Sequence, residues 1–140
     1  LIDMGIEPFL IASSLVMTCA QRLIRKICPN CKEPYKVPKP VFERLGLTKE
    51  ELKELQEKTF YHGRGCQKCR NTGYFGRIGI LEALLINDDI RDMIIKNTSS
   101  DQIKDYAVKH GMITLRMGGI KNFTMGNTTL EEILRVTSEE

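Results

Sequence analysis

Cys28-Pro29-Asn30-Cys31 has a counterpart further along the chain in Cys66-Gln67-Lys68-Cys69. Each Cys-x-x-Cys motif brings two thiolates to one side of a tight turn, and two such motifs supply the four sulfur ligands of a tetrahedral zinc site. Residues 32–65 separate the motifs, which exceeds the roughly 15–20 residues of common zinc ribbons. A metal would therefore close a long loop. The sequence predicts a structural zinc site with four ligands: Cys28, Cys31, Cys66 and Cys69.

Other interpretations of these cysteines are a pair of disulfides, unrelated buried thiols, or a tetrathiolate iron site. The fifth cysteine, Cys19, is left without a partner, which favours a reducing compartment. Because four protein ligands leave no open position for water, the metal would stabilise structure rather than catalyse. His62 could replace one ligand, but we expect it to be an exposed loop histidine because the cysteines already complete the shell.

The composition is that of an ordinary soluble globular protein, with 140 residues, 41% hydrophobic and 28% charged. A net charge of +3 and a pI near 8.6 are too mild to indicate a nucleic-acid-binding protein on their own. Because the first residue is Leu1, we expect the chain to continue a longer protein. The longest apolar run, residues 9–20, is interrupted by hydroxyl side chains and is too short to span a bilayer, and no signal peptide is visible.

Before the first motif, the sequence predicts a helix over residues 8–27. Pro8 suits the first helical position, and apolar side chains recur from Phe9 to Ile27 at helical spacing. The helix would be buried along most of its circumference, with Cys19 as a small core residue. Between the motifs, Pro34, Pro38 and Pro40 indicate an extended linker. Two short helices, over 41–45 and from Thr48, would then form a peripheral flap over the metal site.

After the second motif, the sequence predicts short antiparallel strands over 74–75 and 78–86 and then a bundle of helices. Asn87 would cap a helix over 88–96, and Ser99 a helix ending before Gly111, with His110 at its end. A helix over 113–125 would contain Gly118-Gly119, which indicates close backbone packing or a break. Thr128 would start the last helix through a capping box. The fold class expected is thus α+β and mainly helical.

The chain contains no group that would make it an enzyme by itself. It has no phosphate-binding Gly-x-x-x-x-Gly-Lys-[Ser/Thr] loop and no nucleophile–base pair. Basic residues surround both motifs, and they would either contact nucleic acid or balance the formal −2 charge of Zn²⁺ with four thiolates. We favour charge balance. The residues are Arg22, Arg25, Lys26, Lys32, Lys36, Lys39, Arg64, Lys68, Arg70 and Arg77.

Five strings extend over nearly the whole chain and together are specific for one family. Residues 1–10 (LIDMGIEPFL) and 20–28 (AQRLIRKIC) resemble the segment that follows the nucleotide-binding motifs of bacterial secretion ATPases. Residues 65–80 (GCQKCRNTGYFGRIGI) resemble their second cysteine motif and the next strand. Residues 111–116 and 128–137 resemble their carboxyl terminus. The chain is similar to the C-terminal region of type II secretion and type IV pilus assembly ATPases, in their tetracysteine branch.

The resemblance implies the end of a RecA-like domain over 1–27, a tetracysteine subdomain over 28–77, and a strand with a helical subdomain over 78–140. It implies a hexameric cytoplasmic motor that uses ATP and Mg²⁺ and associates with the inner membrane through a platform protein. The motor would assemble pilins or pseudopilins, and its catalytic motifs would lie before Leu1. Because retraction-type relatives generally lack the four cysteines, we favour assembly, and pilus assembly over secretion. The alternative is an independent zinc-ribbon module that binds nucleic acid.

Overall fold

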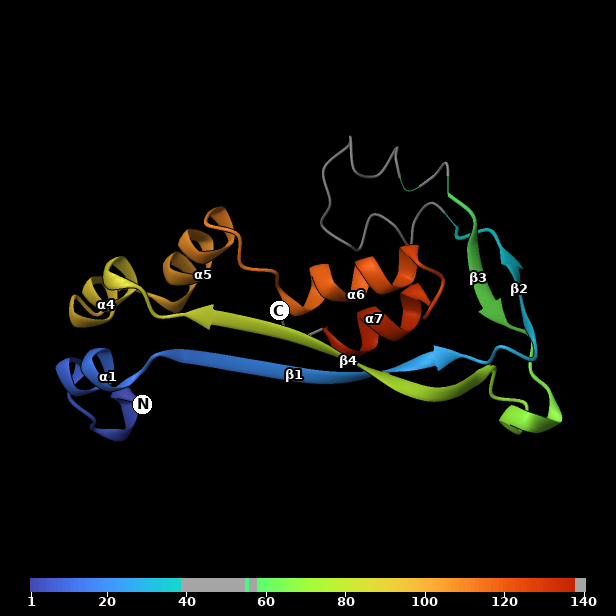
Figure 1. Ribbon diagram of the computed structural model, residues 1–140, viewed down its shortest axis with the longest axis horizontal. Coiled ribbons are helices and arrows are strands. Elements are labelled where there is room, and N and C mark those ends of the chain that lie inside the picture. Colours follow the sequence, from blue (N-terminus) through green and yellow to red (C-terminus); the bar gives the residue numbers. More distant parts are fainter. Residues whose placement is uncertain (39–54, 56–57, 138–140) are drawn as a thin grey trace. The chain divides into compact units, whose positions relative to one another are not determined.

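The computed structural model describes residues 1–38, 55 and 58–137 (Figure 1). This part of the chain contains five α-helices and two two-stranded sheets, which confirms a mixed α and β fold. The residues divide into two compact units. The first unit is Leu1–Gln21 with Leu81–Thr114, and the second is Arg22–Ile80 with Leu115–Glu140. Neither unit is contiguous in sequence.

In the first unit, helix α1 (Pro8–Ser14) packs against helix α4 (Asp88–Ile95). The contact buries Ile11 and Ala12 on α1 and Ile90 on α4. Arg91 adds a hydrogen bond, because its Nε donates to the Ala12 carbonyl oxygen at 3.1 Å. A short 3₁₀ helix, Ile2–Met4, precedes α1.

Two of the predicted helix starts in the first unit are confirmed. Asn87 caps α4, since its side chain accepts a hydrogen bond from the Ile90 N–H. Ser99 caps α5 (Ser100–Lys109) by accepting from the Gln102 N–H. His110 lies at the carboxyl end of α5, also as predicted. Each cap satisfies a backbone donor that has no partner within the helix.

The expected helix over 8–27 is wrong beyond Ser14. The chain becomes extended at Leu15, and Met17–Ile27 forms strand β1, which pairs with β4 (Tyr74–Leu85). Cys19 is accordingly exposed and does not lie in a core. A periodic apolar pattern cannot reveal a partner strand that lies about fifty residues further along the sequence, and this partner determines the hydrogen bonding.

In the second unit, strands β2 (Lys32–Tyr35) and β3 (Phe60–Gly63) form an antiparallel pair (Figure 1). Lys32 lies opposite Gly63, and Tyr35 lies opposite Phe60. Pro34 is therefore part of a strand, whereas the sequence predicted a linker there. The strand tolerates Pro34 because, among the described residues, β2 pairs with a strand on one side only. The two helices predicted over 41–45 and from Thr48 lie outside the described residues.

Helices α6 (Leu115–Thr124) and α7 (Leu130–Val136) complete the second unit and cover its core. The Phe60 and Phe123 rings stack with their centroids 4.2 Å apart. Both rings belong to one cluster of buried residues: Leu55, Phe60, Phe123, Leu130 and Ile133. A smaller buried cluster joins the strands to α6 and consists of Ile24, Ile80 and Leu115.

Gly118-Gly119 lies within a continuous helix, and Gly119 is the point of close packing. A Cβ at Gly119 would lie 2.9 Å from Cγ2 of Ile133 on α7. The last helix begins one residue later than predicted, because Thr129, not Thr128, accepts the hydrogen bond from the Glu132 N–H. Thr128 instead donates to the Arg25 carbonyl oxygen at 2.8 Å and so ties the loop before α7 to β1. Among the residues that the structure describes, no helix is long and apolar enough to span a membrane.

Candidate metal centre

The first Cys-x-x-Cys motif is the turn that connects β1 to β2. Cys28 follows the last residue of β1, and Cys31 precedes the first residue of β2. The Cys31 N–H donates to the Cys28 carbonyl oxygen at 3.3 Å, which closes the turn through Pro29 and Asn30. This geometry directs both thiols of the motif to the same side of the chain.

The second motif surrounds a short 3₁₀ helix, Gln67–Cys69, with Cys66 at its amino-terminal cap. The chain then reverses through Arg70 and Asn71, which both adopt left-handed backbone angles, φ 52° and 60°. The Asn71 N–H donates to the Cys66 carbonyl oxygen at 2.9 Å and fixes this reversal. Two left-handed residues other than glycine in succession are unusual and indicate a tightly determined loop.

Backbone hydrogen bonds join the two motifs directly. The Cys28 N–H donates to the Gly73 carbonyl oxygen at 2.9 Å, and the Arg64 N–H donates to the Cys31 carbonyl oxygen at 3.0 Å. Gly63 and Gly73 cross in close contact, and a Cβ on Gly63 would collide with the Gly73 carbonyl oxygen. The backbone thus holds the motifs together by contacts that do not involve the sulfur atoms.

The four thiols lie within 4.8 Å of one another. Sγ–Sγ distances are 3.9 Å for Cys28–Cys66, 3.9 Å for Cys31–Cys69 and 3.6 Å for Cys66–Cys69. Zn–S bonds of about 2.3 Å in a tetrahedron place sulfur atoms about 3.8 Å apart, which is close to these distances. The observed separations far exceed the roughly 2.05 Å of a disulfide bond, and all four cysteines are free. The donor set and its geometry fit a tetrathiolate metal site.

Hydrogen bonds to sulfur favour the thiolate form. The Gly65 N–H donates to Cys31 Sγ at 3.3 Å, and the Asn30 side-chain amide approaches Cys66 Sγ at 3.5 Å. The Cys69 backbone N–H, together with this amide, lowers the pKa of Cys66 to about 6. Burial instead raises the pKa of Cys31 to about 12. Cys66 is also the least buried of the four cysteines.

Comparison with known proteins identifies the family of this chain. Residues 1–135 match the model of the type II/IV secretion system protein family. The chain belongs to this family. It is 42% identical over 98% of its length to the type IV pilus assembly ATPase PilB of Thermus thermophilus, and it covers 15% of that protein. It is 42% identical over 99% of its length to the type II secretion system protein E of Dickeya dadantii, and it covers 26% of that protein.

A third relative has an equal identity. The type II secretion system ATPase E of Vibrio cholerae is 42% identical over 98% of the chain, which spans 26% of that protein. The chain thus spans about a quarter or less of the length of these relatives. The resemblance seen in the sequence motifs is confirmed at the level of the family.

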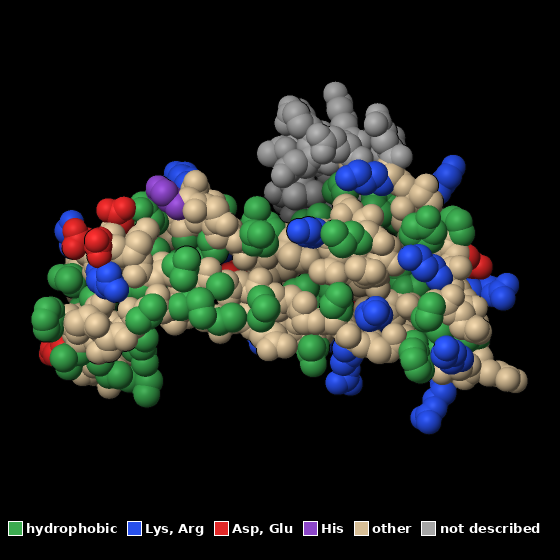
Figure 2. All heavy atoms as spheres, viewed as in Figure 1, with side chains coloured by type: hydrophobic (Ala, Val, Ile, Leu, Met, Phe, Trp, Pro, Cys, Tyr) green, Lys and Arg blue, Asp and Glu red, His purple; other side chains and the backbone are tan. Residues whose placement is uncertain are grey.

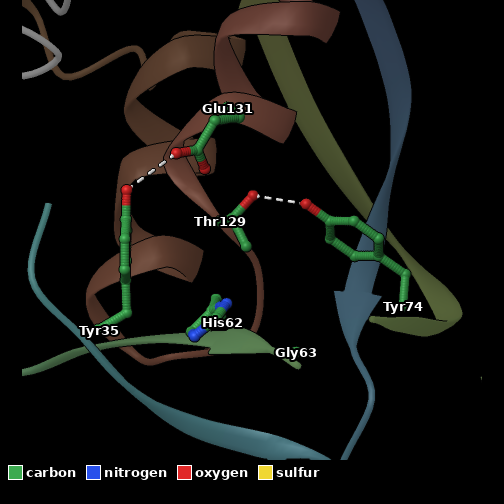
Figure 3. A pocket seen from close by; sticks show the side chains of 6 residues that line it. All are labelled: Tyr35, His62, Gly63, Tyr74, Thr129 and Glu131. Carbon is green, nitrogen blue, oxygen red and sulfur yellow. Dashed lines mark hydrogen bonds between the residues drawn. The ribbon is translucent and has the colours of Figure 1, made fainter. Parts of the chain in front are cut away.

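Neither histidine of this secretion-family chain joins the cysteine cluster. His62 lies in strand β3, not in a loop, and its Nε2 pairs with Glu33 Oε1 at 3.1 Å. Its ring approaches that of Tyr35, with centroids 5.1 Å apart. Figure 3 shows His62 and Tyr35 lining a small pocket beside Glu131. His110 stacks on Tyr106, and its Nδ1 lies 2.8 Å from the Tyr106 carbonyl oxygen.

Sequence reasoning missed Glu132, a buried carboxylate that joins α7 to β1. Its side chain is fully buried and accepts hydrogen bonds from the Arg25 backbone N–H at 3.0 Å and from the Arg25 Nη2 at 2.7 Å. Arg135 donates to both carboxylate oxygens, at 2.9 Å and 2.7 Å. Burial opposes ionisation, but these donors prevail and hold the pKa of Glu132 at about 2. No local pattern in the sequence reveals this contact, because Arg25 and Glu132 come from opposite ends of the chain.

Proposed function

We propose that this chain is the zinc-binding, C-terminal part of an ATPase that drives the assembly of pilins or pseudopilins. The observation that carries the proposal is a tetrathiolate cluster of suitable geometry in a chain of the type II/IV secretion family. Three relatives are named as pilus assembly or type II secretion ATPases. We favour type IV pilus assembly over secretion.

The proposed metal is Zn²⁺, held by Cys28, Cys31, Cys66 and Cys69. Zn²⁺ would neutralise part of the thiolate charge and close the long loop between the two motifs. Because all four ligands come from the protein, no position would be left for a reacting water. We therefore assign this part of the protein a structural role and no catalytic residue. ATP and Mg²⁺ would bind in the remainder of the full-length protein.

The proposed partners follow from the family. The full-length protein would form a homohexamer in the cytoplasm and associate peripherally with the inner membrane through a platform protein. The part that holds the cysteines would contribute contacts between subunits or with that platform. We expect no nucleic acid among its partners.

A direct test combines metal analysis with a functional assay in the bacterium. The purified full-length protein should contain about one zinc per chain at this site, and Cys66→Ser should lose it. Cys19→Ser, which changes a cysteine outside the cluster, is the matched control and should keep the metal. An upstream sequence without a phosphate-binding loop would contradict the assignment to an ATPase.

The pilus and secretion assignments are separated by the phenotype of a gene deletion. Loss of surface pili with normal protein secretion would support pilus assembly, and the reverse would support type II secretion. Complementation with Cys66→Ser should restore less function than complementation with Cys19→Ser. If both variants complement fully, the cysteine cluster has no role in assembly.

A further inference from the structure

In the described part of the second unit, the surface around the cysteine cluster is strongly basic. In the described part of this unit, carboxylates occur only at Glu33, Glu131 and Glu132. Glu132 is buried between two arginines, and Glu33 pairs with His62. Most cations therefore have no carboxylate within ion-pair distance in the described residues. Figure 2 shows Lys and Arg side chains spread over this part of the surface.

Three of these cations lie near one exposed aromatic ring, two of them in the same pocket as the ring. Lys26 and Lys32 line a pocket of about 270 Å³ together with Phe75, and Ile27 and Pro29 add apolar atoms to its wall. Nζ of Lys68 lies 5.3 Å from the centre of the Phe75 ring. Phe75 is 49% exposed, so about half of its surface is available to a partner. We call this site the lysine pocket.

The lysine pocket is built into the fold. Nζ of Lys32 donates to the Gly126 carbonyl oxygen at 2.8 Å and lies 4.3 Å from the centre of the Tyr61 ring. Lys26 lies near the end of β1, and Phe75 is the second residue of β4, so both are carried by the strands that lead into and out of the two cysteine motifs. The cysteine cluster and the pocket therefore share their supporting backbone.

We propose that the lysine pocket binds the phosphate group of an anionic phospholipid at a bilayer surface. The lysines would attract the phosphate, and the half-exposed Phe75 with its apolar neighbours would enter the headgroup layer. The pocket volume suits a headgroup and not a whole lipid. This inference goes beyond the proposed function, since it depends on the second unit alone and not on ATP hydrolysis.

Nucleic acid is the competing polyanion, and the aromatic side chains argue against it. Binding of single strands uses several exposed rings on which bases stack. Here the Tyr61 ring is covered by Lys32, and the Tyr74 ring by Arg25 at 4.2 Å from its centre. Phe75 is left as the one strongly exposed ring among the described residues of the second unit. A single apolar ring among cations fits a headgroup layer better than a strand of bases.

The test measures sedimentation of the zinc-loaded full-length protein with vesicles. We expect binding to vesicles of phosphatidylcholine mixed with phosphatidylglycerol, weakening as salt rises, and little binding to phosphatidylcholine alone. Each lysine near such a surface contributes roughly a fivefold factor, so K26Q/K68Q should weaken binding by roughly tenfold or more. The matched control K96Q/K109Q removes the same charge from exposed lysines of the first unit and should change binding less than about twofold.

A further variant tests the apolar contact of the lysine pocket with the vesicles. Phe75→Ser should reduce binding to anionic vesicles but keep its salt dependence, because it removes apolar contact without changing charge. Zinc content and circular dichroism must match those of the unmodified protein, so that loss of folding is not mistaken for loss of binding. Equal effects of the two double variants would show a general effect of net charge and overturn the proposal.

Two soluble probes complete the test. If a short DNA duplex binds and K26Q/K68Q abolishes that binding without affecting vesicles, the pocket is a nucleic-acid site and the proposal is wrong. Inorganic phosphate that displaces the protein from vesicles at matched ionic strength would assign the pocket to free phosphate. The proposal of a phospholipid site is supported if K26Q/K68Q loses vesicle binding and neither probe affects the vesicle binding of the unmodified protein.

Discussion

Glu132 is the residue on which the carboxyl-terminal helix of the second unit depends. A carboxylate without solvent contact is costly unless its oxygens are paired, and here Arg25 and Arg135 supply side-chain donors to both. The Arg25 N–H adds a backbone donor, so the same carboxylate also accepts a hydrogen bond from the backbone of β1. The arrangement ties together two segments that are far apart in sequence.

Removing this charge should destabilise the protein. Glu132→Gln leaves two arginines beside a neutral amide, and we expect a loss of about 3 kcal/mol in the free energy of unfolding. Urea titration at neutral pH measures this loss. Glu131→Gln changes the neighbouring, exposed carboxylate and should cost much less. Similar costs for the two variants would contradict the role given to Glu132.

The same carboxylate predicts a response to acid. Its pKa in the folded protein is about 2, below the ordinary value of 4.5, so the unfolded chain binds a proton more readily. The stabilisation by Glu132 is therefore complete above about pH 4.5 and is lost as pH falls towards 2. Urea titrations across this interval should show a steeper loss of stability for the unmodified protein than for Glu132→Gln. Parallel curves would contradict the prediction.

Gly73 is a position where a close backbone contact leaves room for glycine only. Its φ is +77°, and a Cβ there would collide with the Gly63 carbonyl oxygen beside the cysteine motifs. We expect Gly73→Ala to weaken zinc binding by tenfold or more, since a shift of about 1.4 kcal/mol suffices. Competition with a chromophoric chelator measures this affinity. Gly76→Ala has a similar φ of +80° but meets no atom within 4 Å, so it separates backbone strain from the collision. If Gly73→Ala and Gly76→Ala weaken zinc binding equally, the loss of affinity comes from backbone strain alone.

At the scale of elements, local signals were reliable and distant pairing was not. Asn87 and Ser99 were recognised as helix caps because a cap depends on residues within one turn. Each Cys-x-x-Cys motif is likewise a local signal, because its two cysteines lie within one turn of the chain. The sequence of β1 predicts a helix because its hydrogen-bond partner, β4, follows only after both cysteine motifs. The local sequence predicts Thr128 as a cap and cannot reveal that its hydroxyl donates to a carbonyl oxygen on β1.

The strand assignment has a direct chemical consequence at Cys19. In a buried helix its thiol would be protected, whereas on β1 it is exposed. We expect a thiol reagent to modify Cys19 rapidly in the zinc-loaded protein and to modify the four cluster cysteines only after chelation. Peptide mapping by mass spectrometry identifies each modified site. Cys19→Ser should remove only the early modification. Rapid modification of Cys28 before chelation would contradict a metal-bound cluster.

At the scale of the whole chain, the cysteine cluster belongs to one of two compact units. It lies in the second unit, whose cores are formed by residues on both sides of the cluster in sequence. The first unit has its own contacts between α1 and α4 and includes none of the four cysteines. Loss of metal should therefore affect the two units unequally, because structural zinc contributes its binding energy to the folding of the segments it joins.

Hydrogen exchange after chelation tests this division. We expect faster exchange in the described residues 28–37 and 60–73, which carry the motifs and strands β2 and β3, since no metal would then hold the four sulfur atoms together. Amides of α4 and α5 should keep their protection, as they depend on contacts within the first unit. Cys66→Ser should reproduce the effect of the chelator, and Cys19→Ser should not. Unchanged exchange around the motifs would show that their backbone hydrogen bonds suffice without metal, and the proposed zinc would then have no structural role.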